Sequence, residues 1–285
     1  MCFKPVFTIG FVARAFRFGI GLMRAPARNQ LSDTARRAED LGYDVVLAPD
    51  HLGGIAPFPV MTAMAMATST LRVGTFVLNA GFYRPALLGR DAAALQELSG
   101  GRLELGLGTG YVEEEFAAAG LPYPSAGARI DHLRHTCEYV AEHLPDVPVM
   151  IAGNGDRVLR LAARTADIVG LTGGDRPPTA GEDPLAERIA FVRAAAGDRF
   201  DALELNLAIT AMPVDGSGVP DLTIPRHFLP GLSDDELLRH PGVLSGSSRE
   251  MADRILGYRD RYGISYVIVQ DRHAEAFGEV IAMLK

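Results

Sequence analysis

Tryptophan is absent from the 285-residue sequence, and cysteine occurs only at positions 2 and 137. Two cysteines make no disulfide framework, and no CxxC or HExxH spacing marks a metal site. Cys137 shares a helical stripe with Leu133 and Val140, so we predict a small buried core residue at that position. The sequence therefore predicts no bound metal.

Long apolar runs are missing as well. Arg14 and Arg17 interrupt the apolar start of the chain, and no run approaches the roughly 20 residues that a membrane span needs. Basic residues are outnumbered, with 28 Lys and Arg against 35 Asp and Glu. A nucleic-acid surface would need clustered Lys and Arg. We therefore expect a cytoplasmic protein that binds neither a membrane nor nucleic acid.

What the sequence does contain is organised around the stretch 71–111. Small and apolar residues at 73–78 predict a strand that ends in the turn-prone Asn79, Ala80 and Gly81. A helical pattern runs to Leu98, and a second strand at 103–107 leads into more glycines. Strand, helix and strand in this order form a right-handed parallel crossover, so both strand ends lie at the same edge of the sheet.

The same alternation continues along the chain. The predicted strands cover 16–22, 43–47, 73–78, 103–107, 147–151, 167–171, 203–209 and 266–269. Eight strands alternating with eight helices predict an α/β fold of the (β/α)8 barrel type, with a doubly wound open sheet as the alternative. The absence of an early GxGxxG favours the barrel. We expect a leader at 1–15 and a single barrel domain at 16–285.

One segment breaks the alternation. Residues 212–244 carry five prolines and a predicted short helix near 234–238. A loop of this length after the seventh strand of a compact domain is typical of a lid or a binding loop.

In a barrel, the carboxyl ends of the strands form the site. His51 follows the second strand, where an imidazole can take a proton or bond a cofactor carbonyl; the alternative is a histidine that caps the turn. We expect Asp50 to orient neighbouring backbone. Gly108, Thr109, Gly110 and Tyr111 follow the fourth strand, where glycines allow a flat ring or a phosphate to approach the backbone.

A second candidate lies between the fifth strand and the next helix, at Gly153, Asn154, Gly155, Asp156 and Arg157. Free amides at a helix N-terminus beside an arginine suit a phosphate, but an ordinary turn with Asp156 as a helix-start acid explains the pattern equally well. We interpret three further histidines as solvent-facing: His132, His135 and His143.

Three stretches together resemble the bacterial luciferase-like flavin and deazaflavin oxidoreductases: AEDLGYDVVLAPDHL, TSTLRVGTFVLNAGFYRPALLGRDAAALQELSGGRLELGLGTGY and PVMIAGNGDRVLRLAARTADIVGL. The resemblance covers nearly the whole chain from Phe16 onward and is greatest for the F420-dependent subgroup. It implies a (β/α)8 barrel that holds the cofactor ring at the carboxyl ends of the strands.

The resemblance also implies roles for individual residues. A non-proline cis peptide between Phe76 and Val77 would support the ring, and Asn79 would lie near its polar edge. The stretch 153–157 would hold the cofactor phosphate. His51 would act as a base or as a partner at the hydride-transfer site.

Three departures separate the chain from the sugar-phosphate dehydrogenases of this subgroup. Ile55 stands where those enzymes have a tryptophan, and Tyr111 stands where they have a glutamate proposed as the proton donor. Leu144-Pro-Asp-Val147 joins a helix and a strand that a longer segment separates in those enzymes. Sugar-phosphate oxidation is therefore not expected, and Tyr111 becomes the candidate partner for the proton.

The resemblance predicts an F420-dependent oxidoreductase that transfers a hydride between the deazaflavin and a small organic substrate. One alternative is a monooxygenase that uses reduced FMN, oxygen and a partner flavin reductase. Another is a flavin-binding barrel without catalysis. Such barrels often pair as homodimers.

Overall fold

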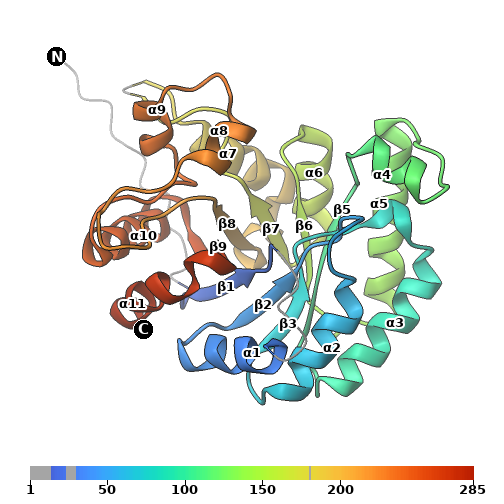
Figure 1. Cartoon of the computed structure of the whole chain (residues 1–285). Coiled ribbons are helices and arrows are strands. Elements are labelled where there is room, and N and C mark those ends of the chain that lie inside the picture. Colours follow the sequence, from blue (N-terminus) through green and yellow to red (C-terminus); the bar gives the residue numbers. More distant parts are fainter. Residues whose placement is uncertain (1–13, 24–29, 180) are drawn as a thin grey trace.

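A computed structural model describes residues 14–23, 30–179 and 181–285, in which parallel strands close into a barrel (Figure 1). The strands are β1 (Arg17–Gly21), β2 (Val45–Ala48), β3 (Arg72–Thr75), β4 (Leu78–Asn79), β5 (Leu103–Gly108), β6 (Val149–Ala152), β7 (Ile168–Leu171), β8 (Glu204–Ile209) and β9 (Ile264–Gln270). Their order is β3-β2-β1-β9-β8-β7-β6-β5-β4, and β3 also pairs with β5. Because β3 and β4 are two pieces of the third strand, the barrel has eight positions, as predicted.

Helices surround the barrel on its outer side (Figure 1). The longer ones are α1 (Leu31–Asp40), α2 (Pro57–Ala67), α3 (Pro85–Leu98), α5 (Ala126–His143), α6 (Asp156–Thr165), α7 (Pro184–Ala196), α10 (Ser248–Tyr262) and α11 (Ala274–Leu284). Proline in the first turn starts α2, α3 and α7, where its missing N–H has no helical partner to lose. Cys137 is buried on α5, as predicted.

Short helices occupy two further segments. Helix α4 (Glu113–Ala118) follows β5, where the sequence analysis predicted no helix. Between β8 and α10, the segment 212–244 contains α8 (Thr223–Phe228) and α9 (Asp234–Arg239), so the predicted short helix near 234–238 is confirmed. Most of the predicted leader, residues 1–13, lies outside the described residues.

The segment 212–244 is a folded unit rather than an open loop. Leu222, Leu237 and Val243 are buried against Ala211 in a small apolar cluster, and Ala211 also pairs with Val243 as an isolated bridge. Ser233 and Glu236 form a capping box at the start of α9. The segment 212–244 is therefore compactly folded although it contains five prolines.

The third strand is broken at the peptide bond between Phe76 and Val77, which is cis. The sequence predicted one continuous strand here, but β3 ends at Thr75 and β4 begins at Leu78. The Thr75 hydroxyl fills the gap, donating to the carbonyl of Gly106 at 2.8 Å and accepting from the N–H of Gly106 at 2.9 Å. The barrel wall thus stays hydrogen-bonded across the break.

The inside of the barrel has two distinct zones. An apolar cluster in the middle comprises Val45, Leu47, Met150, Ile168, Tyr266 and Ile268. At the amino ends of the strands, Arg17 forms ion pairs with Glu104 and Glu204, and the Tyr266 hydroxyl donates to Glu104 at 2.9 Å. The opposite end, where the strands finish, is the barrel mouth.

Candidate active site at the barrel mouth

His51 lies just after β2 and pairs with a carboxylate from another element. Its Nδ1 is 2.9 Å from Oε1 of Glu115 on α4, and the two side chains are 48% and 16% exposed. The ring of Tyr111 stands edge-on to the imidazole with centroids 6.2 Å apart. The structure therefore brings the two predicted catalytic residues together and adds Glu115, to which the sequence analysis assigned no role.

Asp50 connects the ends of two neighbouring strands. Its Oδ2 accepts the backbone N–H of Asn79 at 3.0 Å, which confirms that Asp50 orients backbone. Burial raises the pKa of Asp50, and the bond from Asn79 only partly opposes that rise. Burial, together with the nearby Asp50 carboxyl, also raises the pKa of Tyr83. Asp50 thus contacts both Asn79 and Tyr83, the residues on either side of the turn at 80–82.

Asn79 is buried beneath the turn after β5. Its Oδ1 accepts from the N–H of Gly81 at 3.0 Å and caps the short helix η1 (Ala80–Phe82). A Cβ on Gly110, which has φ of +70°, would lie 2.1 Å from that same oxygen. Glycine is therefore required at position 110 by both its conformation and the Asn79 carboxamide.

The glycines of β5 make room for the broken third strand. A Cβ on Gly106 would lie 2.0 Å from the carbonyl oxygen of Thr75, and one on Gly108 would lie 2.8 Å from the Val77 side chain. In the structure, Thr75 and Val77 take the space beside Gly106 and Gly108, and the prediction that Gly108 lets a flat ring or a phosphate approach the backbone stays a prediction.

The turn after β6 offers free polar groups at the start of α6. Gly155 occupies the N-cap without any side-chain hydrogen bond to the helix, and a Cβ there would meet nothing within 4 Å. Arg157 is exposed, and within the described part of the chain its guanidinium has no ion pair. Asp156 pairs with Arg188, so its charge is partly compensated. Asn154 accepts from the Thr172 hydroxyl at 2.7 Å, which ties this turn to the end of β7.

The mouth also contains a residue that the sequence analysis missed. Tyr266 and Ile268 of β9 belong to the inner cluster, and strand alternation places Gln270 on the same inward face, at the end of the strand. Its Oε1 is buried and, among the described residues, has no hydrogen-bond partner. A buried unpaired amide oxygen is costly, so it marks a place where a ligand donor would fit. In the sequence, the alternation of Tyr266, Ile268 and Gln270 along one strand could have indicated that Gln270 faces the inside of the barrel.

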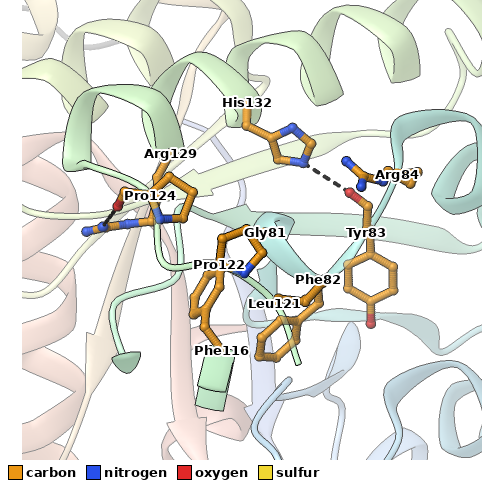
Figure 2. Close-up of a pocket in the computed structure, with 10 residues that line it drawn as sticks. All are labelled: Gly81, Phe82, Tyr83, Arg84, Phe116, Leu121, Pro122, Pro124, Arg129 and His132. Atoms are coloured by element: carbon orange, nitrogen blue, oxygen red, sulfur yellow. Dashed lines mark hydrogen bonds between the residues drawn. The ribbon is translucent and has the colours of Figure 1, made fainter. Parts of the chain in front are cut away.

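A cavity of about 200 Å³ lies beside the mouth, between η1, α4 and α5 (Figure 2). Its walls are mainly apolar: Phe82, Phe116, Leu121, Pro122 and Pro124. His132 closes one side, with Nε2 3.0 Å from the carbonyl oxygens of both Ala80 and Tyr83. The prediction that His132 faces solvent is therefore wrong, because two carbonyls need its N–H, while His135 and His143 are exposed as predicted.

Two negative observations apply to the described residues. No three His, Cys, Asp or Glu side chains gather there as a metal site requires. The helices of this part are too short or too polar for any of them to cross a membrane.

Comparisons with known proteins agree on the kind of barrel. A family model described as luciferase-like monooxygenase matches residues 9–215. The chain is 31% identical over 192 residues to an F420-dependent glucose-6-phosphate dehydrogenase of Amycolatopsis mediterranei (strain U-32), covering 56% of this chain and 55% of that protein. It is 25% identical over 244 residues to a 5,10-methylenetetrahydromethanopterin reductase of Methanolobus tindarius, covering 74% of each.

A solved structure extends the likeness to nearly the whole chain. The coenzyme F420-dependent tetrahydromethanopterin reductase of Methanopyrus kandleri superposes with a TM-score of 0.76 at 18% identity, covering 95% of this chain and all of that one. At this identity the match concerns the fold. The alignment with the Amycolatopsis enzyme spans only about half of that enzyme's length.

Proposed function

The chain belongs to the luciferase-like monooxygenase family, and within it we propose an F420-dependent oxidoreductase that transfers a hydride between the deazaflavin and a small organic substrate. The observation that carries the proposal is the His51–Glu115 pair at the barrel mouth. It occurs in a chain that is 31% identical over 192 residues to an F420-dependent dehydrogenase. A histidine held by a carboxylate suits the proton transfer that accompanies such a reaction.

The residues at the mouth fit a cofactor with a flat ring and a phosphate. Phe76 is half-buried and packs against the inner apolar cluster, offering an apolar surface for a ring. The buried Oε1 of Gln270, which no described residue contacts by a hydrogen bond, offers an acceptor at the same mouth. The start of α6 and the exposed Arg157 offer amides and a positive charge for a phosphate.

Each part of the site then has one task. F420 supplies the carbon that accepts or returns the hydride when it is bound. Phe76, Val77, Asn79 and the glycine turn at 108–110 shape the ring site, and 153–157 hold the phosphate. His51, with Tyr111 beside it, holds the proton. The unit 212–244, anchored where Nε2 of His240 bonds the Gly174 carbonyl at 3.2 Å, borders the substrate side.

We do not extend the proposal to glucose 6-phosphate, the substrate in the name of the Amycolatopsis relative. Ile55 stands where the resemblance expects a tryptophan, and it is buried in the core. Tyr111, 70% exposed, stands where the glutamate is expected. The chain would therefore act on a different small organic molecule.

The family description itself favours one alternative, a monooxygenase that uses reduced FMN with a partner flavin reductase. Such an enzyme would consume oxygen when given FMN and a reductase. A flavin-binding barrel without catalysis is the other alternative. In each case we propose a cytoplasmic single-domain barrel at 16–285 that pairs as a homodimer.

Calorimetric titration with oxidised F420 and, separately, with FMN tests the proposal. We expect micromolar or tighter F420 binding and much weaker FMN binding. In Arg157→Ala the F420 dissociation constant should rise about tenfold, the loss of one charge-assisted contact. Arg164→Ala, in the last turn of the same helix, is the matched control.

Each other result has a definite meaning. Tighter binding of FMN than of F420 would favour the monooxygenase. If neither cofactor bound, the proposal that this chain uses F420 would be wrong. Unchanged F420 affinity in Arg157→Ala would exclude 153–157 as the phosphate site.

A further inference from the structure

We propose that Glu115 is a positioning residue that fixes His51 in the tautomer with its proton on Nδ1, so that Nε2 is the nitrogen that exchanges a proton at the mouth. The statement about Nε2 rests on the proposed function. The statement about the tautomer does not, because it follows from the contact between the two side chains.

The contact determines the direction of the hydrogen bond. An ionised carboxylate has acceptor oxygens only, so a bond between Oε1 of Glu115 and Nδ1 of His51 at 2.9 Å needs the proton on Nδ1. Neutral imidazole carries one proton, which leaves Nε2 with a free lone pair. Among the described residues, Nε2 of His51 has no hydrogen-bond partner. Nε2 is thus the available base, and a proton taken there makes an imidazolium that the carboxylate stabilises.

Helix α4 is anchored so that Glu115 reaches His51. The next residue, Phe116, is buried, with its ring centroid 5.3 Å from that of Phe82 and 5.2 Å from that of Tyr123. Gly81 leaves the space for this ring, because a Cβ there would lie 2.6 Å from it. Figure 2 draws Phe116 with Phe82 and Gly81 among the residues that line the cavity. A buried aromatic anchor beside Glu115 therefore sets the position of its carboxylate.

The other polar groups that face His51 do not fix its tautomer. The Asp50 carboxyl is occupied by the Asn79 N–H. Tyr111 presents its ring to the imidazole edge-on and is mostly exposed. Glu113 and Glu114 share the first turn of α4 with Glu115 and suit its helix dipole equally, but both are exposed. Only Glu115 combines the first-turn position with the contact to His51.

The test is nitrogen NMR of protein labelled with ¹⁵N-histidine, recorded at a pH where His51 is neutral, with His51→Asn to assign the signals. In the unaltered protein we expect His51 to show a protonated Nδ1 and an unprotonated Nε2. In Glu115→Ala the population should move to the Nε2-protonated form, which a free imidazole prefers. Glu114→Ala, which removes a neighbouring charge from the same helix turn, should match the unaltered protein.

Two results would overturn the proposal: an Nε2-protonated His51 in the unaltered protein, or the same spectrum for Glu115→Ala and Glu114→Ala. Because the spectra need neither cofactor nor turnover, this outcome is independent of whether F420 binds. A separate titration should give Glu115→Ala an F420 dissociation constant within about twofold of the unaltered value. A tenfold loss would make Glu115 a binding residue instead.

Discussion

Histidine side chains in this barrel illustrate how environment decides what one residue type does. His51 is half-exposed and faces a carboxylate, whereas His132 bonds two backbone carbonyls and holds η1 against α5. His240 is buried, accepts from the Gly242 N–H at 3.1 Å and anchors the unit 212–244. His273 is buried, and its Nδ1 has no hydrogen-bond partner within the part of the chain that the structure describes. Of these, only His51 combines a carboxylate partner with access to solvent.

His273 should make the protein sensitive to acid. Burial lowers its pKa to about 4, with Arg272 adding to the effect, whereas in the unfolded chain it is near 6.5. As pH falls from about 6.5 to 4, the unfolded chain takes up a proton that the folded chain does not, so stability falls. For this group the loss from pH 7 to pH 5 is about 2 kcal/mol.

Urea unfolding at pH 7 and pH 5 checks this. His273→Gln cannot charge, so its free energy of unfolding should fall by about 2 kcal/mol less than that of the unaltered protein over this interval. His135→Gln, at an exposed position on α5, is the matched control. Parallel losses in the unaltered protein and His273→Gln would contradict the assignment.

At the scale of elements, the third strand can pack against β5 only because Gly106 has no side chain. A Cβ on Gly106 would lie 2.0 Å from the Thr75 carbonyl oxygen, which is backbone and cannot rotate away. Gly106→Ala should therefore destabilise the protein by about 3 kcal/mol or more. It should also weaken F420 binding, because Phe76 and Val77 of the proposed ring site directly follow Thr75.

The matched change is Gly257→Ala on α10, where a Cβ meets nothing within 4 Å. Position 257 is exposed and lies inside the helix, so alanine there should stabilise the protein by up to about 1 kcal/mol. Chemical unfolding of the two variants side by side measures both effects. If both shifted stability by similar amounts, the close approach at Gly106 would not be a constraint.

How far the sequence determined these elements depended on their hydrophobic patterns. Long amphipathic segments such as α5 and the apolar strands were predictable, as was the place of His51 at a strand end. Helix α4 was not, because its six residues begin with three glutamates and bury only Phe116, too few positions for a helical stripe. Missing α4 also meant missing Glu115, since its partnership with His51 spans 64 positions in sequence.

Across the whole molecule, the two ends of the barrel are built differently. Small and polar residues lie at the mouth, whereas a buried group of ion-paired side chains fills the opposite end. There Arg17 of β1 pairs with Glu104 of β5 and, at 2.5 Å, with Glu204 of β8. Its guanidinium also lies 4.5 Å from the ring centroid of Tyr266 on β9. One side chain thus links four strands across the barrel.

Arg17→Met should leave two carboxylates buried without their cation. The Glu104 and Glu204 side chains are 1% and 10% exposed, and breaking a buried pair by removing one partner costs about 3–5 kcal/mol. The matched control is Arg37→Met, whose pair with Glu275 joins side chains 54% and 67% exposed, and whose unfolding midpoint should not change. Urea unfolding of the two variants measures the contrast.

Protonation separates an electrostatic origin of this loss from a packing origin. Carboxylates stranded by Arg17→Met favour the neutral acid, so lowering the pH from 8 to 5 should recover part of the lost stability relative to the unaltered protein. Adding Glu104→Gln and Glu204→Gln to Arg17→Met should recover stability at pH 8 as well. If the deficit were the same at both pH values and in the triple variant, Arg17 would contribute through packing on Tyr266, and the charges would not be what closes this end of the barrel.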